Sequence, residues 1–231
     1  MRVTRLGREV DYDEAWALQR RLHDEVVAGG DDELLLLEHA FVYTAGTSTQ
    51  DADLPTDGSR VVHVDRGGRI TWHGPGQLVA YPIVAIGDLG VVDWVRRLED
   101  AILDTMRPLG LDVDRIRGRA GVWLRGDGTP FVRDRKIAQV GVRVAGGVSM
   151  HGIAINVDPD LSAFGRIVPC GITDAGVTSI AAELGSAPSV AEVGDAFADA
   201  LAALGVAAVR RAADVPAEPT ASRPARQEVA A

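Results

Sequence analysis

Short apolar runs bounded by glycine-rich turns constrain the fold of this chain most, because such runs are typical of buried strands. Only three stretches instead show the helical spacing of apolar residues: Tyr12 to about Val27, Val91 to Arg107, and the stretch after Ser189. Strands that outnumber helices, without strict alternation, predict an α+β domain with a mixed, mainly antiparallel sheet flanked by helices. The expected strands cover residues 34–37, 61–64, 70–72, 78–84, 121–124, 137–144 and 148–157.

Capping residues support the three helices. Asp11 precedes the first, Pro108 follows the second, and Ser189 forms a capping box with Glu192 at the start of the third. After Arg211 the chain is rich in Ala, Pro, Glu and Arg and has no apolar period. We therefore expect one folded domain over residues 1–211 and a disordered tail over residues 212–231.

Composition excludes several classes of protein. The formal net charge of −9 argues against a general nucleic-acid binder, which would show a basic face. No apolar run approaches the ~20 residues of a membrane span. The N-terminus lacks the basic-then-apolar layout of a signal peptide, so the cytoplasm is the expected compartment. Since no long apolar helix stripe is left over, we expect a monomer.

Cysteine and lysine, two residue types that can take part in proton and acyl transfer, each occur only once. Cys170 is the single cysteine, so no internal disulfide can form. Lys136 is the single lysine among 24 basic residues, and the rest are arginine. A lysine retained in such a chain can give up a proton, which arginine does not do at any working pH. The count alone does not separate this role from the chance survival of one surface lysine.

Two segments combine glycines with polar residues. Residues 66–77 hold four glycines and a proline between two expected strands, which lets the backbone approach a ligand closely. The alternative is a tight hairpin with incidental polar residues. Residues 136–143 begin with Lys136 on an expected strand, and Gly141 interrupts its apolar pattern.

Two further segments place a histidine and the cysteine beside glycine. His151 is followed by Gly152 inside an expected strand, as in a pocket wall, although an isolated histidine is more often a hydrogen-bonded core residue. Cys170 lies between Pro169 and Gly171, a turn that can present a thiol and offer N–H groups to an oxyanion. The alternative is an inert buried cysteine.

A metal site is not expected. His73, His151 and Cys170 could supply three ligands, but their spacing matches no standard motif. We predict neither a metal nor another cofactor.

The lone cysteine and the lone lysine have a joint explanation in acyl transfer. A thiolate exchanges thioesters without ATP, and a nearby ammonium favours the thiolate. Lys136 can act as acid toward the leaving thiol and, once neutral, as base toward an incoming amine. The sequence thus predicts that Cys170 carries an acyl group from a thioester to a protein lysine.

The motifs resemble those of the lipoyl(octanoyl) transferases. Residues 66–82, from Arg66 through the run Trp-His-Gly-Pro-Gly-Gln to Pro82, look like the family signature, and the segments at 121–123, 136–138, 151–157 and 169–171 match its other motifs in order. The resemblance covers about residues 1–205. It implies the fold of the biotin and lipoate protein ligases and transfer of an octanoyl group from octanoyl-acyl-carrier protein.

The resemblance also implies partners and site residues. The acceptors would be lysines of lipoyl domains in 2-oxoacid dehydrogenases and of the glycine-cleavage H protein. Cys170 would be the nucleophile and Lys136 the residue that lowers its pKa, with His151 and Gly171 in support. An acidic carrier protein would dock on arginines, for which the candidates are Arg66, Arg69, Arg143 and Arg166. The acyl group would contact Arg66, Gly67, Gly68, Arg69, Ile70, Thr71, Trp72, His73, Gln139, Val140, Gly141, Gly152, Ile153 and Ala154.

Four alternatives stay open. An ATP-dependent lipoate or biotin protein ligase shares the fold but does not need a nucleophilic thiol. An octanoyl amidotransferase would use the same thioester chemistry with an amide donor. A cysteine hydrolase would pair Cys170 with His151 or His73 and admit water. A non-catalytic binding module would keep its function without the thiol of Cys170.

Overall fold

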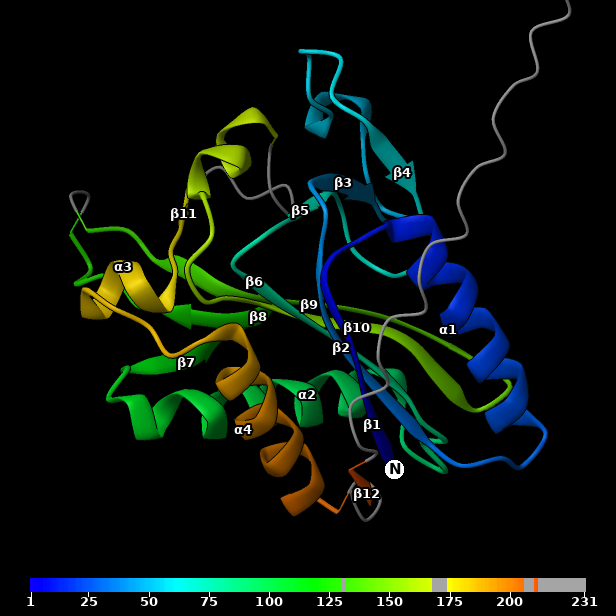
Figure 1. The fold of residues 1–231 in the computed structure, drawn as a ribbon. Coiled ribbons are helices and arrows are strands. Elements are labelled where there is room, and N and C mark those ends of the chain that lie inside the picture. Colours follow the sequence, from blue (N-terminus) through cyan, green and yellow to red (C-terminus); the bar gives the residue numbers. More distant parts are fainter. Residues whose placement is uncertain (130–131, 168–173, 206–209, 212–231) are drawn as a thin grey trace, which may run out of the picture.

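The computed structural model describes residues 1–129, 132–167, 174–205 and 210–211. A mixed, mainly antiparallel sheet forms its centre (Figure 1). Neighbouring strands pair in antiparallel fashion from β2 to β7 along the order β12-β1-β2-β6-β10-β9-β8-β7, whereas β1 pairs in parallel with β2 and β12, and β11 in parallel with β9. The strands are β1 Arg2–Val10, β2 Glu33–His39, β6 Gln77–Ile83, β7 Val113–Ile116, β8 Arg119–Leu124, β9 Arg135–Ala145, β10 Val148–Asn156, β11 Gly176–Val177 and β12 Arg210–Arg211. The predicted fold class is confirmed.

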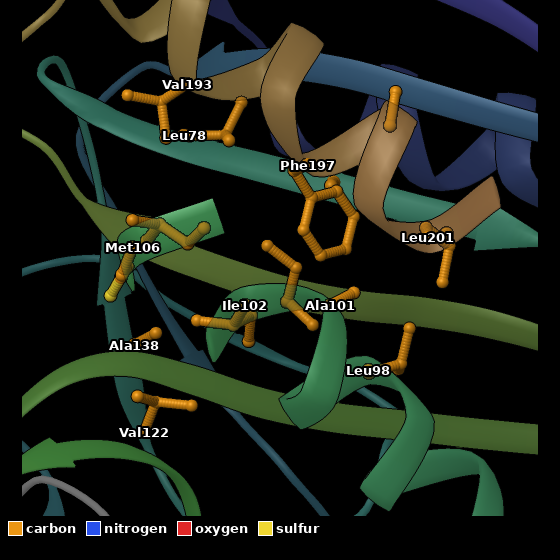
Figure 2. Close-up of a cluster of buried hydrophobic side chains, with 14 of the residues drawn as sticks. Leu78, Leu98, Ala101, Ile102, Met106, Val122, Ala138, Val193, Phe197 and Leu201 are labelled. Atoms are coloured by element: carbon orange, nitrogen blue, oxygen red, sulfur yellow. The ribbon is translucent and has the colours of Figure 1, made fainter. Parts of the chain in front are cut away.

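Helices cover both faces of this sheet (Figure 1). Helices α2 (Val91–Met106) and α4 (Val190–Ala203) pack together on one face, where Leu36 and Leu78 are buried. Figure 2 shows Phe197 of α4 beside Ala101 and Ile102 of α2 in this core. Helix α1 (Tyr12–Val27) covers the opposite face, which carries the alternating residues Leu35, Leu37, Val79 and Tyr81.

A smaller sheet lies beside α1 and one end of the main sheet, at the top of Figure 1. Its strands are β4 Val61–His63, β3 Val42–Ala45 and β5 Thr71–His73, in the order β4-β3-β5. Tyr43, Ile70, Trp72 and Phe164 form its own hydrophobic cluster. The remaining short elements are α3 Ile180–Leu184, η1 Asp51–Asp53, η2 Arg107–Leu109 and η3 Leu161–Arg166.

The three predicted helices are present with nearly the predicted bounds. Asp11 accepts hydrogen bonds from the N–H groups of Asp13 and Glu14, and the capping box of Ser189 and Glu192 is formed. Helix α2 ends at Met106, one residue before the prediction, where a 3-10 turn containing Pro108 begins. The tail predicted to be disordered, residues 212–231, lies outside the described residues. None of the helices in the described part of the chain has the length and apolar character needed to cross a membrane.

Candidate active site

A cavity of about 240 Å³ opens on the face of the main sheet that α1 covers, next to β5. Residues from α1, β5, β6, β8, β9, β10, the 66–69 loop and the β7–β8 turn line it. Thirteen predicted site residues are among its lining residues: Arg66, Gly68, Arg69, Thr71, His73, Lys136, Gln139, Val140, Gly141, His151, Gly152, Ile153 and Ala154. The fold therefore gathers three of the four predicted segments around one cavity.

Two predicted acyl-site residues instead pack away from this cavity. Ile70 and Trp72 lie in the hydrophobic cluster of the smaller sheet with Phe164, because they alternate with Thr71 and His73 along β5 and the residue before it. Gly67 is also absent from the cavity lining, and its N–H donates to the carbonyl oxygen of Val142. Cys170 and Gly171 lie outside the described residues.

A second and larger cavity, of about 850 Å³, lies on the other side of β5 from the first. Trp72 lines it together with residues of β1, β2 and the start of α4. Among the residues that the structure describes, the two cavities share no lining residue, and Trp72 is the one predicted site residue in the larger cavity. Size alone therefore does not mark the site, and the chemistry predicted from the sequence belongs to the smaller cavity.

Lys136 reaches the smaller cavity because of a β-bulge. Along β9, Ala138 pairs with Val122 and Lys136 pairs with Trp123, which leaves Ile137 as an extra residue. Ile137 and Ala138 both enter the core under α2, whereas Lys136 and Gln139 both line the cavity although they are three residues apart. A regular strand would have placed these two side chains on opposite faces.

The surroundings of Lys136 restrict its side chain. It is 5% exposed, and its Nζ lies 4.8 Å from the centroid of the Trp123 ring, in a cation–π geometry. A Cβ at Gly121, which has φ +102°, would stand 3.1 Å from Cε of Lys136 and 2.3 Å from the carbonyl oxygen of Ala138. Glycine at position 121 thus leaves the space in which the ammonium sits beside the indole.

Arg66 is an interior residue of the site. It is 7% exposed, and its guanidinium donates to the carbonyl oxygens of Thr44, Gly67 and Arg69 and to Oγ1 of Thr44, over 2.8–3.1 Å. A Cβ at Gly141 would lie 3.1 Å from Cδ of Arg66, so glycine lets the arginine lie against β9.

Burial removes Arg66 from the predicted docking patch, whereas Arg69, Arg143 and Arg166 are partly exposed and stay a prediction. The other three arginines bind carboxylates of this chain: Arg69 binds Asp53, Arg143 binds Asp65 and Arg166 binds Asp57.

The cavity wall carries polar atoms that have no hydrogen-bond partner among the described residues. They are Oγ1 of Thr71, both amide atoms of Gln139 and Nδ1 of His151, all buried. A ligand that was only a saturated hydrocarbon would leave these polar groups without hydrogen bonds, at a cost of about 1–3 kcal/mol each. The cavity is therefore suited to a ligand that combines an apolar body with a carbonyl or amide group.

His151 is held in a strained backbone conformation by two residues that the sequence reasoning missed. Its φ is +57°, its N–H donates to Oε1 of Gln19 over 2.9 Å, and its Nε2 lies 2.8 Å from Oδ1 of Asp65. Burial lowers the pKa of His151, and the hydrogen bond to His151 lowers the pKa of Asp65. Through His151, Gln19 of α1 and Asp65 at the start of the glycine-rich loop are both hydrogen-bonded to β10.

Two tyrosines form the part of the cavity wall next to α1, and His39 contacts one of them. Tyr12 and Tyr81 line the cavity, and Nε2 of His39 lies 2.8 Å from the Tyr81 hydroxyl. Nδ1 of His39 lies 2.9 Å from the carbonyl oxygen of Val10, so it carries the proton and Nε2 accepts. Burial lowers the pKa of His39 to about 4 and raises that of Tyr12 to about 12, so both are neutral near pH 7.

Stability should therefore fall in mild acid. Unfolded His39 titrates near pH 6.5, so between pH 6.5 and 4 the unfolded chain binds more protons at this position than the folded chain. The stabilising contribution is complete above pH 6.5 and is lost as the pH falls toward 4, an effect of about 3 kcal/mol. Urea unfolding at several pH values should show a smaller acid loss in His39→Phe than in the wild type. Equal losses in the two proteins would contradict this assignment.

The fold defines the class of protein. The chain is similar to a solved bipartite lipoate protein ligase from Thermoplasma acidophilum, with a TM-score of 0.68 and 16% identity over 93% of this chain and 87% of that one. It is also similar to the biotin protein ligase of Aquifex aeolicus in complex with biotin and ATP, with a TM-score of 0.55 and 14% identity over 88% and 69%. The predicted biotin and lipoate protein ligase fold is thus confirmed.

The sequence identifies the family. The family described as "Lipoyl protein ligase A/B catalytic domain" matches residues 11–202, so this chain belongs to it. Curated relatives named "Octanoyltransferase" include one from Mycobacterium sp. (strain KMS), 57% identical over 85% of this chain and 82% of that protein. Another, from Mycolicibacterium smegmatis, is 54% identical over 86% of each chain.

Proposed function

We propose that this chain transfers an octanoyl group from octanoyl-acyl-carrier protein to the lysine of lipoyl domains through a thioester on Cys170. Octanoyl transfer in protein lipoylation rests on the relatives named Octanoyltransferase and on the family. The observation that carries the chemistry is the position of Lys136: the one lysine of the chain lines the cavity that the predicted motifs form.

The reaction balances with these two residues. The Cys170 thiolate attacks the octanoyl thioester, the carbon–sulfur bond to the donor breaks, and the Lys136 ammonium gives its proton to the leaving thiolate. The neutral Lys136 amine then takes one proton from the acceptor lysine, which enters as its neutral amine. That lysine attacks the acyl-enzyme, forms the amide and releases Cys170 as the thiolate. Neither ATP nor a metal enters these steps.

The cavity supports an acyl ligand. Glycines at 141 and 152 and the small Ala154 form its wall on β9 and β10, and polar atoms of Thr71 and Gln139 can meet the acyl carbonyl. We propose lipoyl domains of 2-oxoacid dehydrogenases and the glycine-cleavage H protein as acceptors, and a monomeric enzyme that acts in the cytoplasm.

The donor separates this proposal from an ATP-dependent ligase, which the fold alone would also permit. Purified chain and an unmodified lipoyl domain should give octanoylated domain with octanoyl-acyl-carrier protein alone. Free octanoate with ATP and Mg²⁺ should give none, and a lipoyl domain whose acceptor lysine is replaced by arginine is the control. Modification that requires ATP and free acid would reject the proposal in favour of a ligase.

A further inference from the structure

A continuous chain of buried hydrogen bonds connects His73, on the cavity wall, to the backbone of Lys136. Nδ1 of His73 lies 2.8 Å from Oε1 of Gln77. Nε2 of Gln77 donates to Oδ1 of Asn156 over 2.9 Å, and Nδ2 of Asn156 donates to the carbonyl oxygen of Thr178 over 2.8 Å. Gln77 and Asn156 are fully buried, and His73 and Thr178 are 7% and 3% exposed. We call these four residues the relay.

The far end of the relay is joined to Lys136 by backbone contacts. The N–H of Thr178 donates to the carbonyl oxygen of Lys136 over 2.9 Å, and Val177 of β11 pairs with Lys136 of β9. The near end reaches Arg66: Nε2 of His73 lies 3.3 Å from Oγ1 of Thr44, which accepts from the guanidinium of Arg66 over 2.9 Å. The relay thus connects two groups on the wall of one cavity.

The two ends fix the direction of every hydrogen bond between them. Thr178 offers a carbonyl, so Asn156 must donate with its amide nitrogen and accept with its oxygen. Gln77 must then donate to Asn156, and its oxygen must accept from Nδ1–H of His73. Oγ1 of Thr44 accepts from Arg66 and keeps its own proton for Nε2 of His73.

This order requires a neutral His73. A proton on Nε2 would confront the Thr44 hydroxyl oxygen with a second charged donor beside the Arg66 guanidinium. Burial, with further contributions from His39 and Arg66, holds the pKa of His73 well below its usual range, which agrees with the neutral ring. Each member then has one compatible partner on each side, and such a network holds its residues in one arrangement.

We propose that Gln77 and Asn156 are positioning residues, which through Thr178 set where Lys136 stands against Trp123 and the cavity. The expected effect on catalysis rests on the proposed function, whereas the effect on the position of Lys136 does not. Neither residue lines the cavity, so neither has a part in binding the acyl group directly. Their role is to hold β11 against the bulge of β9, so that the Lys136 side chain does not move away from the reacting atoms.

Lys136 can be observed directly because it is the one lysine of the chain. Lysine labelled with ¹³C gives a single side-chain spin system, and the indole ring 4.8 Å from Nζ shifts the ε-methylene protons by its ring current. We expect Asn156→Leu and Gln77→Met to move this ε-methylene resonance toward the value of free lysine. The same variants should lower kcat for octanoyl transfer by about 100-fold with little change in the donor KM, since displacement by about 1 Å can cost that much.

Ser149→Ala is the matched control. Ser149 is a fully buried residue of the same strand β10, and its hydroxyl donates to the carbonyl oxygen of Pro82, away from the relay. Its loss should lower the melting temperature as the Asn156 change does, yet leave the Lys136 resonance and kcat unchanged. Gln77→Met covers the case in which Asn156→Leu does not fold.

The two possible failures are distinguishable. Folded relay variants whose Lys136 resonance and kcat match those of the wild type would overturn the positioning role. If the Lys136 resonance moved in these variants but the wild-type chain transferred no octanoyl group, the positioning role would be supported and the proposed function rejected.

Discussion

Replacing Lys136 by arginine is expected to lower the rate of octanoyl transfer by about 10²–10⁴-fold, the usual contribution of a positioned acid or base. Arginine keeps the positive charge but neither gives up nor takes a proton at working pH. The guanidinium would also have to fit the space beside Trp123 that Gly121 leaves open. Single-turnover transfer from octanoyl-acyl-carrier protein to a lipoyl domain measures the effect.

Lys136→Met separates the two roles of the lysine. It removes both charge and proton, so a loss similar to that of the arginine variant would show that proton transfer dominates. If Lys136→Arg kept most of the wild-type rate while Lys136→Met lost it, charge alone would suffice and the acid–base role would be wrong.

Replacing Cys170 by serine is expected to abolish transfer, with a loss of up to about 10⁶-fold, as when another enzyme loses its covalent nucleophile. A hydroxyl is far less acidic than a thiol, and an oxygen ester does not keep the acyl group activated as a thioester does. Since Cys170 is the single cysteine, one equivalent of iodoacetamide should inactivate the wild type completely. A serine variant or an alkylated enzyme that retained transfer would contradict the covalent role of Cys170.

Much of the fold could be predicted from local signals. Capping residues and helical spacing located α1, α2 and α4, because these signals lie within each helix. Strand β1 lies near the edge of the sheet, and an arginine at every third position, Arg2, Arg5 and Arg8, interrupts its apolar residues, so its sequence does not predict a buried strand. Strand β3 was hidden by the apolar residues of β2 that precede it closely.

The site could be predicted only in part. The glycine-rich segments marked three parts of the cavity wall. Successive side chains along residues 70–73 point to opposite sides, so Ile70 and Trp72 could not line the same cavity as Thr71 and His73. The β9 bulge depends on pairing with β8, which no local pattern reports. Asp65 and Gln19 meet His151 over 86 and 132 residues of sequence, so their roles appear only when the chain is folded.

Intact mass spectrometry of the full chain, after incubation with octanoyl-acyl-carrier protein without ATP, reports directly on the proposed thioester at Cys170. We predict a gain of one octanoyl group that hydroxylamine removes, that Cys170→Ala lacks, and that a lipoyl domain discharges onto its own lysine. An unmodified mass, together with lipoyl-domain modification only when ATP and free octanoate are present, would contradict the thioester mechanism.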